Sequence, residues 1–459
     1  MNSFRNLIQK YNQPVPRYTS YPTVPFWDSA LPDKNRWIQT VQQTFKATNT
    51  QEGISLYLHL PFCESLCTYC GCNKRITKNH AVEPVYLQAI LKEWDMYREI
   101  LGEKPVIREI HLGGGTPTFF SPENLTFLLT NLLACTEIHP NHEFSFEGHP
   151  NNTAREHLQA LYELGFRRVS YGVQDLSLKV QQAINRIQPF GNVKNGTEMA
   201  RETGYTSVNF DLIYGLPFQT LESIKDTFEQ VITLQPDRIA FYSYAHVPWK
   251  EKSQRAYSEE DLPQDEEKLA LYELGREMLL AAGYHDVGMD HFAIAEDDLY
   301  LAKQENRLHR NFMGYTTNNT KLLIGLGVSA ISDAYYGYMQ NVKTVEEYYA
   351  LLKMDELPIV KGYFCTDEDV EMRKHILNVA CTGKTTWKQN ETSEQLHPEA
   401  ILKLLHLEED GLVELGLNGM NITPLGNRFI RNICNAFDLK MIEAESQAGV
   451  PEKMFSKAV

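Results

Sequence analysis

The chain lacks any apolar run long enough to cross a bilayer, and its N-terminus has no short apolar core of the kind found in export signals. It also lacks an excess of positive charge, because 44 Lys and Arg stand against 59 Asp and Glu, for a formal net charge of −15. This balance argues against nucleic-acid and anionic-membrane partners. We therefore expect a cytoplasmic protein with no membrane span and no nucleic-acid partner.

Cysteines are few, and half of them are isolated. The chain has 8 among its 459 residues, which is long enough for two or three structural units around a sizeable core. Scattered thiols in a long chain without an export signal do not favour a disulfide framework. The isolated cysteines are Cys135, Cys365, Cys381 and Cys434.

The other cysteines are clustered. Cys63, Cys67 and Cys70 follow an apolar run with C-x3-C-x2-C spacing. Three thiolates on one loop can hold three irons of a [4Fe–4S] cluster, and since such clusters normally take four ligands, one iron would stay open to a small molecule. Cys72 follows two residues later, so a four-thiolate zinc site is an alternative, although structural zinc sites usually pair two separate Cys-x2-Cys units. We interpret Cys72 as a residue beside the cluster.

Short apolar runs alternate with longer amphipathic stretches after residue 50. Predicted helices include Val85–Leu101, Glu156–Leu164 and Leu221–Thr233, and a polar stretch at 249–268 is expected to be an exposed connection. The alternation predicts βαβ units, a parallel sheet and, with about six units, a partial (β/α)6 barrel whose chemistry lies at the carboxyl ends of the strands. The predicted strands are Ile54–Leu60, Val106–Leu112, Glu143–Glu147, Arg168–Gln174, Ser207–Tyr214 and Arg238–Tyr244.

The chain changes character near residue 361. Asp367–Val379 and Pro398–Leu407 are predicted to be helices, Gly411–Leu415 and Met420–Thr423 a hairpin, and Pro424–Phe437 a last helix. Helices with a small wing resemble a winged-helix unit, but the acidic charge favours a lid or packing role over DNA binding. The predicted units are a cover segment at 1–50, the barrel with a C-terminal extension at 51–360, and a mainly helical, winged-helix-like domain at 361–459.

Glycine-rich and polar residues follow the predicted strands. Gly113–Thr118 follows the second strand, and its three glycines either make a tight turn or let the backbone approach a ligand closely. Glu147, Gln174 and Asp211 lie at later strand ends, and Arg186 follows the fourth strand. Each alone could be an ordinary cap or turn residue. Together they can bind hydroxyl, carboxylate and ammonium groups, so we predict one polar site at this end of the barrel.

The cysteine loop resembles that of the radical S-adenosylmethionine (SAM) enzymes, and further motifs extend the similarity over nearly the whole chain. On these motifs the chain resembles the oxygen-independent coproporphyrinogen III oxidase family. The N-terminal Tyr-rich segment, the cluster loop and the His-Arg-Asn-Phe sequence are the most specific. The motifs are Pro16–Thr23, Cys70–Lys74, Gly113–Thr118, Asp211–Pro217, Tyr244–His246, Gly288–Ala293, His309–Thr317, Gly327–Ser332 and Arg431–Cys434.

The resemblance implies a radical SAM oxidoreductase of porphyrin and haem biosynthesis that converts coproporphyrinogen III to protoporphyrinogen IX. A 5′-deoxyadenosyl radical would remove hydrogen from the β-carbon of a propionate, and loss of CO2 and one electron would leave a vinyl group. The alternative is a haem chaperone or another protein of the same superfamily. An electron-donor protein such as flavodoxin or ferredoxin is implied as a partner, and we expect a monomer.

The resemblance also implies roles for individual residues. Cys63, Cys67 and Cys70 would ligate the cluster, and two SAM molecules would bind beside it. The chain departs from the family pattern at Gly148 and His149, where we expect a hydrophobic residue and Asp. The first SAM would contact Tyr57, Tyr69, Gly115, Thr116, Glu147 and Ala245. The second would contact Gly71, Gly114, Gln174, Arg186, Asp211 and Ile331.

The implied substrate carries four propionates, which an acidic chain must bind through a local set of cationic and hydrogen-bonding groups. Solvated surface charge is the alternative for each candidate. The Tyr- and Pro-rich N-terminal segment has little helix propensity and is predicted to cover the barrel mouth. The candidate substrate residues are Arg17, Tyr18, Arg307, His309 and Arg310.

Overall fold

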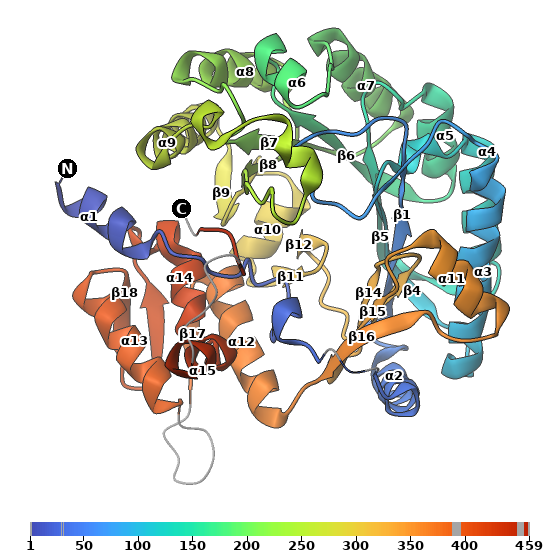
Figure 1. Ribbon diagram of the computed structural model, residues 1–459. Helices are drawn as coiled ribbons and strands as arrows, with labels where there is room; N and C mark the ends of the chain where they lie inside the picture. Colours follow the sequence, from blue (N-terminus) through green and yellow to red (C-terminus); the bar gives the residue numbers. More distant parts are fainter. Residues whose placement is uncertain (1, 29, 31, 388–395, 448–453, 458–459) are drawn as a thin grey trace.

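The computed structural model describes residues 2–28, 30, 32–387, 396–447 and 454–457. Six neighbouring parallel strands form the middle of a large curved sheet, with helices along its outer side (Figure 1). In their order in the sheet, which is also their order in the chain, they are β1 (Ile54–Leu60), β4 (Val106–Gly114), β5 (Glu137–Gly148), β6 (Phe166–Gln174), β7 (Ser207–Tyr214) and β8 (Arg238–Ser243).

The six predicted strands are confirmed, and β1 and β7 have the predicted limits. Every residue of β1 except Tyr57 is buried, because one face of the strand meets helices and the other faces the barrel interior. The connecting helices that cover the sheet are α3 (Val82–Leu101), α4 (Pro122–Leu133), α5 (Arg155–Glu163), α6 (Leu178–Ala183), α7 (Phe190–Thr203), α8 (Leu221–Thr233) and α9 (Asp265–Ala281).

Further strands extend the sheet on both sides. Beyond β1, the strand β13 (Leu323–Leu326) is parallel to it, and β14 (Ile331–Asp333), β15 (Gly337–Asn341) and β16 (Ile359–Phe364) continue antiparallel. Beyond β8, β10 (His291–Ala293) and β9 (His285–Gly288) are antiparallel. In the described part of the chain, β16 and β9 are the two edges of the sheet, so the barrel is partial.

Two large hydrophobic clusters, and a small third one around Val180 and Leu216, fill the described part of the molecule. The larger one follows the barrel and includes Trp37 and Phe45 of α2 (Lys34–Thr48), so this helix packs on the barrel. The second joins Tyr18 and Tyr21 of the N-terminal segment to the C-terminal helices. The N-terminal 50 residues thus contribute side chains to both of these clusters. The predicted domain boundaries at residues 50 and 360 stay predictions.

The C-terminal region combines helices with a small sheet. Its predicted first two helices are present as α12 (Asp367–Thr382) and α13 (Pro398–Glu409). The predicted hairpin forms from β18 (Val413–Gly416) and β19 (Gly419–Ile422), and β17 (Lys384–Thr386) adds a third strand. The single last helix predicted at 424–437 is instead a 3-10 turn followed by α14 (Ile430–Asn435) and α15 (Leu439–Gln447).

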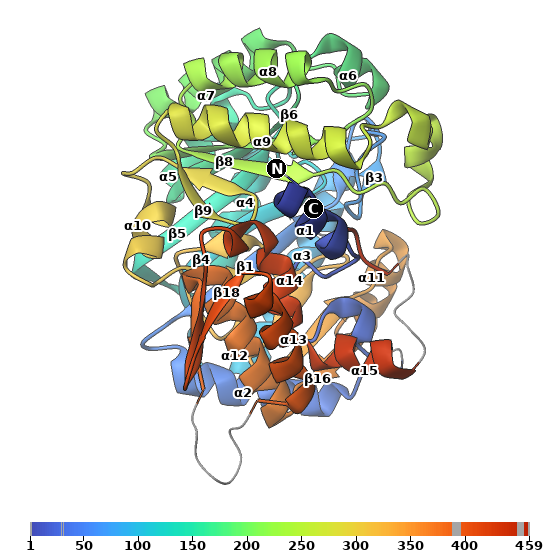
Figure 2. The same cartoon turned by 90° about the vertical axis from the view of Figure 1, so that its left-hand side faces the viewer.

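The N-terminus lies against this region. The side chain of Asn432 in α14 donates to the carbonyl oxygen of Tyr11 across 2.9 Å, and Figure 2 shows the two segments beside each other.

No helix among the described residues combines the length and apolar character needed to span a membrane. The remaining elements are α1 (Asn2–Tyr11), β2 (Phe62–Cys63), β3 (Arg75–Ile76), α10 (Asp298–Gln304), β11 (His309–Asn311), β12 (Gly314–Thr316), α11 (Val345–Lys353) and short 3-10 turns at Val24–Phe26, Pro117–Phe119, Lys252–Ala256, Glu259–Asp261 and Gly426–Phe429.

The prediction of an exposed connection at 249–268 is wrong in part. Gln254 is only 2% exposed, and its side-chain amide donates to the carbonyl oxygens of Tyr69 and Ala245. Its side-chain oxygen accepts from the backbone N–H of Val247 at 2.6 Å. A polar composition predicts exposure only when the polar groups are not satisfied internally, and here one amide satisfies three backbone groups.

Candidate active site

A cavity of about 610 Å³ lies at the carboxyl ends of the parallel strands. It brings together most of the residues that the sequence predicted for cluster and SAM binding. The candidates that line it are Cys63, Cys67, Tyr69, Cys70, Gly71, Gly114, Gly115, Thr116, Glu147, Gln174, Arg186 and Asp211.

The cysteine loop follows β1 and is held in place by backbone hydrogen bonds. The strand β2 pairs with β3, and the N–H of Thr77 donates to the carbonyl oxygen of Cys63 at 2.9 Å. The Lys74 ammonium donates to the carbonyl oxygens of Cys70 and Cys72 at 2.9 and 3.2 Å. The N–H of Thr68 donates to the Ile184 carbonyl oxygen at 3.0 Å, which fixes the loop against the end of α6. The three thiols are therefore presented from a fixed loop.

The surroundings favour ionised sulfur at Cys70 and oppose it at Cys63 and Cys72. The hydrogen bond from Cys72 lowers the pKa of Cys70 below its ordinary value, and the charges of Lys74 and Arg186 act in the same direction. The same hydrogen bond raises the pKa of Cys72, which therefore stays the proton donor of the pair. This agrees with a place for Cys72 beside the cluster. Burial raises the pKa of Cys63 to about 11, so ionisation of this thiol depends on an added positive centre such as iron.

The donor set fits an iron–sulfur cluster. Thiolates are the ligands that such clusters prefer, and three of them face a cavity with room for the cluster and a further molecule. Among the described residues, no three potential ligands are arranged as around a single metal ion. A four-iron cube instead needs its thiolates spread around it.

The glycine-rich loop leaves no space for side chains. Gly114 has a φ of 112°, and a Cβ atom there would lie 2.7 Å from the His59 ring. A Cβ atom on Gly115 would lie 2.5 Å from the carbonyl oxygen of Pro61. The N–H of Gly114 donates to Glu147 at 3.2 Å. Only glycine therefore allows the end of β4 to pack against the cysteine loop and line the cavity.

Two carboxyls, one on β5 and one on β7 with β6 between them, have different ionisation. Burial opposes ionisation of Glu147, but the imidazole of His111 and the N–H of Gly114 together hold its pKa below the ordinary value. Burial, and then the charge of Glu147, raise the pKa of Asp211 to about 6. The Asp211 carboxyl accepts from the hydroxyl of Ser170 at 3.0 Å and the amide of Asn209 at 2.9 Å. Both carboxyls can accept hydrogen bonds from hydroxyl or ammonium groups near neutral pH.

Arg186 contributes the one guanidinium among the described residues that line the cavity. Its Nη2 donates to the Gly172 carbonyl oxygen at 2.7 Å and its Nη1 to Sγ of Cys67 at 3.6 Å. Its Nε is buried without a hydrogen-bond partner. Gln174 lies on the same side with an unusual φ of 66°. A bound anionic group could take the unused donor, since buried guanidinium atoms are seldom left unpaired.

Three SAM candidates do not line the cavity. The Tyr57 hydroxyl lies 3.1 Å from Nδ1 of His59, behind the glycine-rich loop. The carbonyl oxygen of Ala245 accepts from Gln254, and Ile331 pairs with Gln340 in the sheet. Their contacts with SAM stay predictions.

The cavity also has lining residues that the sequence analysis did not assign. His149, at the departure from the family pattern, lines it, and burial followed by the charge of Arg186 lowers its pKa to about 3. The imidazole is therefore neutral. The unassigned residues flank predicted strand ends, which is the signal that could have found them; they include Ser170, Gly172, Asn151, Asn152 and Tyr242.

The substrate candidates lie elsewhere. Arg17 lies with its guanidinium carbon 5.8 Å from the ring centre of Tyr242, which lines the cofactor cavity, and donates to the Ser243 carbonyl oxygen at 2.8 Å. Tyr18 is buried, and its hydroxyl donates to Asp438. The others line a second cavity, together with Tyr18, and these residues are Arg307, His309 and Arg310.

The fold and this site define a radical SAM protein. The family model of the Radical SAM superfamily matches residues 57–231, which include the cysteine loop and most of the strand-end residues. The family of this chain can be named more closely from its relatives. The oxygen-independent coproporphyrinogen III oxidase of Helicobacter pylori is 37% identical, over 98% of this chain and 98% of its own length. That of Pseudomonas aeruginosa is 38% identical, over 94% of this chain and 95% of its own.

A solved structure supports the same assignment. The coproporphyrinogen III oxidase of Escherichia coli, described as a radical SAM enzyme, superposes with a TM-score of 0.87 at 34% identity, covering 95% of this chain and 98% of that chain. This chain therefore belongs to the oxygen-independent coproporphyrinogen III oxidase family. The predicted family and fold class are confirmed, and a [4Fe–4S] cluster and SAM are its cofactors. The alternative of a haem chaperone finds no support among these relatives.

Proposed function

We propose that this chain catalyses the oxygen-independent oxidative decarboxylation of coproporphyrinogen III to protoporphyrinogen IX. The observation that carries the proposal is one cavity that joins three thiols, a glycine-rich loop, two carboxyls and a guanidinium at the carboxyl ends of the strands. This is the end of a parallel barrel at which chemistry is expected. The reaction belongs to porphyrin and haem biosynthesis.

The cluster and SAM, when bound, supply one-electron cleavage of SAM to the 5′-deoxyadenosyl radical that abstracts hydrogen from a propionate. Cys63, Cys67 and Cys70 would hold the cluster. The Lys74 ammonium and the Arg186 guanidinium would offset the negative charge of the thiolates.

The polar residues of the cavity would hold and orient SAM. The carboxylates of Glu147 and Asp211 can accept from the ammonium and ribose hydroxyl groups, and Arg186 can donate to a carboxylate. The resemblance to the oxygen-independent coproporphyrinogen III oxidase family implies two SAM molecules, so the proposal includes two. Gln174 and Arg186 lie on the side of the cavity next to Cys67.

The substrate would approach from the side of Tyr242, where Arg17 offers a cationic group. An N-terminal segment at this position would exclude water from the cavity during turnover. We further propose that the enzyme acts as a cytoplasmic monomer, with an electron-donor protein such as flavodoxin or ferredoxin, and that residues 1–50, 51–360 and 361–459 are its three units.

The test is anaerobic reconstitution of the cluster, followed by mass spectrometry of the products from coproporphyrinogen III, SAM and a chemical reductant. The proposal predicts a product lighter by two CO2 and four hydrogen atoms. The Cys67→Ala protein is the control and should give none of it. SAM cleavage in the intact protein without any loss of CO2 would overturn the proposal.

A further inference from the structure

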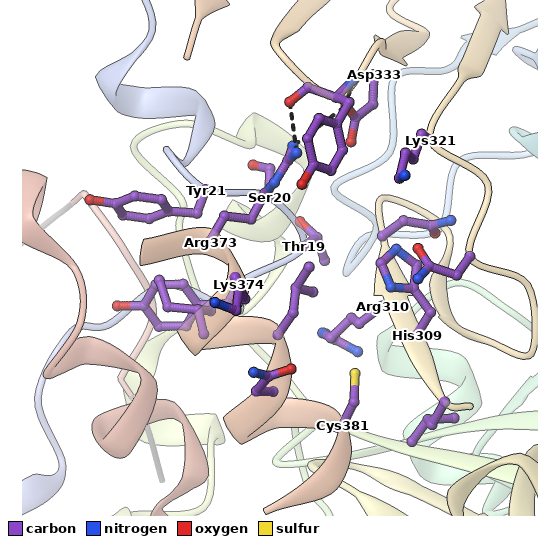
Figure 3. A pocket seen from close by; sticks show the side chains of 18 of the residues that line it. Thr19, Ser20, Tyr21, His309, Arg310, Lys321, Asp333, Arg373, Lys374 and Cys381 are labelled. Atoms are coloured by element: carbon purple, nitrogen blue, oxygen red, sulfur yellow. Dashed lines mark hydrogen bonds and ion pairs between the residues drawn. The ribbon is translucent and has the colours of Figure 1, made fainter. Parts of the chain in front are cut away.

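A second cavity, of about 550 Å³, shares no lining residue with the cofactor cavity. The N-terminal segment 18–21, the hairpin β11–β12 with its approach at 306–308, the loop 317–321 and helix α12 surround it, and Figure 3 shows labelled side chains from these segments around one space. The loop leads into β13, whose Leu323 pairs with Ser55 near the start of β1. The cavity therefore lies at the opposite end of the sheet from the cysteine loop.

The charge of this second cavity contrasts with that of the whole chain. Its lining contains five Lys or Arg side chains and one Asp, whereas the lining of the cofactor cavity contains three Lys or Arg and three Asp or Glu. The chain as a whole has a formal charge of −15. A local excess of positive charge in an acidic protein attracts anions. The cations are Arg307, Arg310, Lys321, Arg373 and Lys374.

Arg310 differs from the other cations in this lining. The other four each have an acidic partner in an ion pair, whereas the described residues provide Arg310 with none. Arg310 is only 7% exposed; its Nη2 donates to the carbonyl oxygen of Arg17 at 3.2 Å, but Nε and Nη1 have no hydrogen-bond partner. The guanidinium carbon lies 4.7 Å from the ring centre of Tyr315, which partly offsets the cost of burial.

A buried guanidinium with two unused donors is unfavourable unless an acceptor arrives. A carboxylate or phosphate would supply both the opposite charge and the acceptor oxygens, in the forked geometry that guanidinium groups match. His309 beside it is neutral, because burial and then the charge of Arg373 lower its pKa to about 4. Its imidazole can donate one N–H to an anion without adding charge.

We propose that this second cavity is a binding site for a ligand with carboxylate or phosphate oxygens, anchored by Arg310 and flanked by Lys321 at the rim. The proposal rests on the charge and contacts of this cavity alone and uses no step of the oxidase reaction. Arg17 connects this cavity to the cofactor cavity, since its carbonyl oxygen accepts from Arg310 and its side chain lies over Tyr242.

The test measures direct binding with two probes at fixed ionic strength. Coproporphyrin III, a fluorescent tetracarboxylate, tests the carboxylate arm, and inorganic phosphate, followed by calorimetry, tests the phosphate arm. Arg310→Gln removes the anchor, and Lys321→Gln removes an exposed charge at the rim, which pairs with Glu52. Lys46→Gln removes one exposed charge on α2, outside the lining of the cavity, and is the matched control.

We expect at least one probe to bind to Arg310→Gln about tenfold or more weakly than to the intact protein. Lys321→Gln should lose less affinity than Arg310→Gln, and Lys46→Gln should bind as the intact protein does. Weakening of coproporphyrin binding alone identifies a carboxylate ligand, and weakening of phosphate binding alone identifies a phosphate ligand. The variants should rank in the same order of affinity when Cys67→Ala is also present. Because Cys67→Ala should stop the proposed reaction, this result tests the binding proposal separately from the reaction. Failure of both probes to bind the holoprotein, or equal binding by all variants, would overturn it. If Arg310→Gln does not fold, Lys321→Gln decides between these outcomes.

Discussion

The guanidinium of Arg186 donates to Sγ of Cys67 across 3.6 Å. Its other terminal nitrogen donates to the carbonyl oxygen of Gly172, near the end of β6, at 2.7 Å. One side chain thereby connects the cysteine loop to the strand that carries Gln174. We infer that cluster and SAM binding are coupled through this residue, because moving the guanidinium alters both a thiolate and a strand end.

The cysteine series tests the cluster. Replacement of Cys63, Cys67 or Cys70 by Ala should remove the visible absorption of the reconstituted cluster, because each supplies one iron ligand. Cys72→Ala should keep much of it, since Cys72 only donates a hydrogen bond to Cys70. Cys135→Ala, which removes an exposed thiol outside the loop, is the control. A complete four-iron cluster in Cys67→Ala protein would exclude this ligand set.

Arg186 tests the number of SAM molecules. Equilibrium binding of SAM to the anaerobic holoprotein should approach two molecules per chain. Arg186→Gln should weaken one of them about tenfold or more, because a charge-assisted hydrogen bond contributes about 1.5–3 kcal/mol. Arg155→Gln, at an exposed ion pair with Glu202, should leave both unchanged. Saturation of the intact protein at one SAM would contradict the second site.

Asp211 predicts a pH dependence of SAM binding. Its pKa of about 6 means that the carboxyl is mostly neutral at pH 5 and mostly ionised at pH 7. The ionised form accepts hydrogen bonds more strongly, so the affinity of one SAM site should rise about tenfold over this range. In Asp211→Asn protein this rise should be absent, while any pH dependence that comes from SAM itself persists. Parallel curves for the two proteins would rule out Asp211 as the titrating group.

Arg17 tests the approach of the substrate. Arg17→Gln should lower kcat/KM for coproporphyrinogen III about tenfold, because one charge-assisted contact with a propionate is lost, and should leave the cluster and substrate-free SAM cleavage intact. Arg5→Gln, at an exposed ion pair with Glu266, is the control. Deletion of the segment before Thr23 is a poorer test, since it also removes Tyr18 and Tyr21 from the second hydrophobic cluster. Unchanged efficiency in Arg17→Gln would place this side chain outside the substrate site.

Local signals in the sequence were sufficient for the strands and the cofactor cavity. The predicted strands are short apolar runs, and residues at or near their carboxyl ends line the cavity, as Glu147 does near the end of β5. The cavity could thus be predicted because neighbouring parallel strands align their carboxyl ends. The extra strands β14 and β15 were missed because they are short and pair antiparallel across a turn, with no helical stretch between them to mark a βαβ unit.

Some residues could not be placed from the sequence, because long-range packing decides their positions. In the sequence, Arg310 and Arg17 are both cations near specific motifs. In the structure, Arg310 lines the second cavity, whereas the Arg17 side chain lies over Tyr242. Gln254 lies in a polar stretch but is buried, with one hydrogen bond to Tyr69 in a segment distant in the sequence. Such positions follow from tertiary contacts, which composition and periodicity do not encode.

The most direct test of the central claim is the fate of the abstracted hydrogen. Coproporphyrinogen III deuterated at the β-carbons of its propionates would be turned over under strictly anaerobic conditions, and the 5′-deoxyadenosine would be analysed by mass spectrometry. The account predicts deuterium in the 5′-deoxyadenosine of the intact protein, in proportion to the vinyl groups formed. Decarboxylated product accompanied by unlabelled 5′-deoxyadenosine would contradict it.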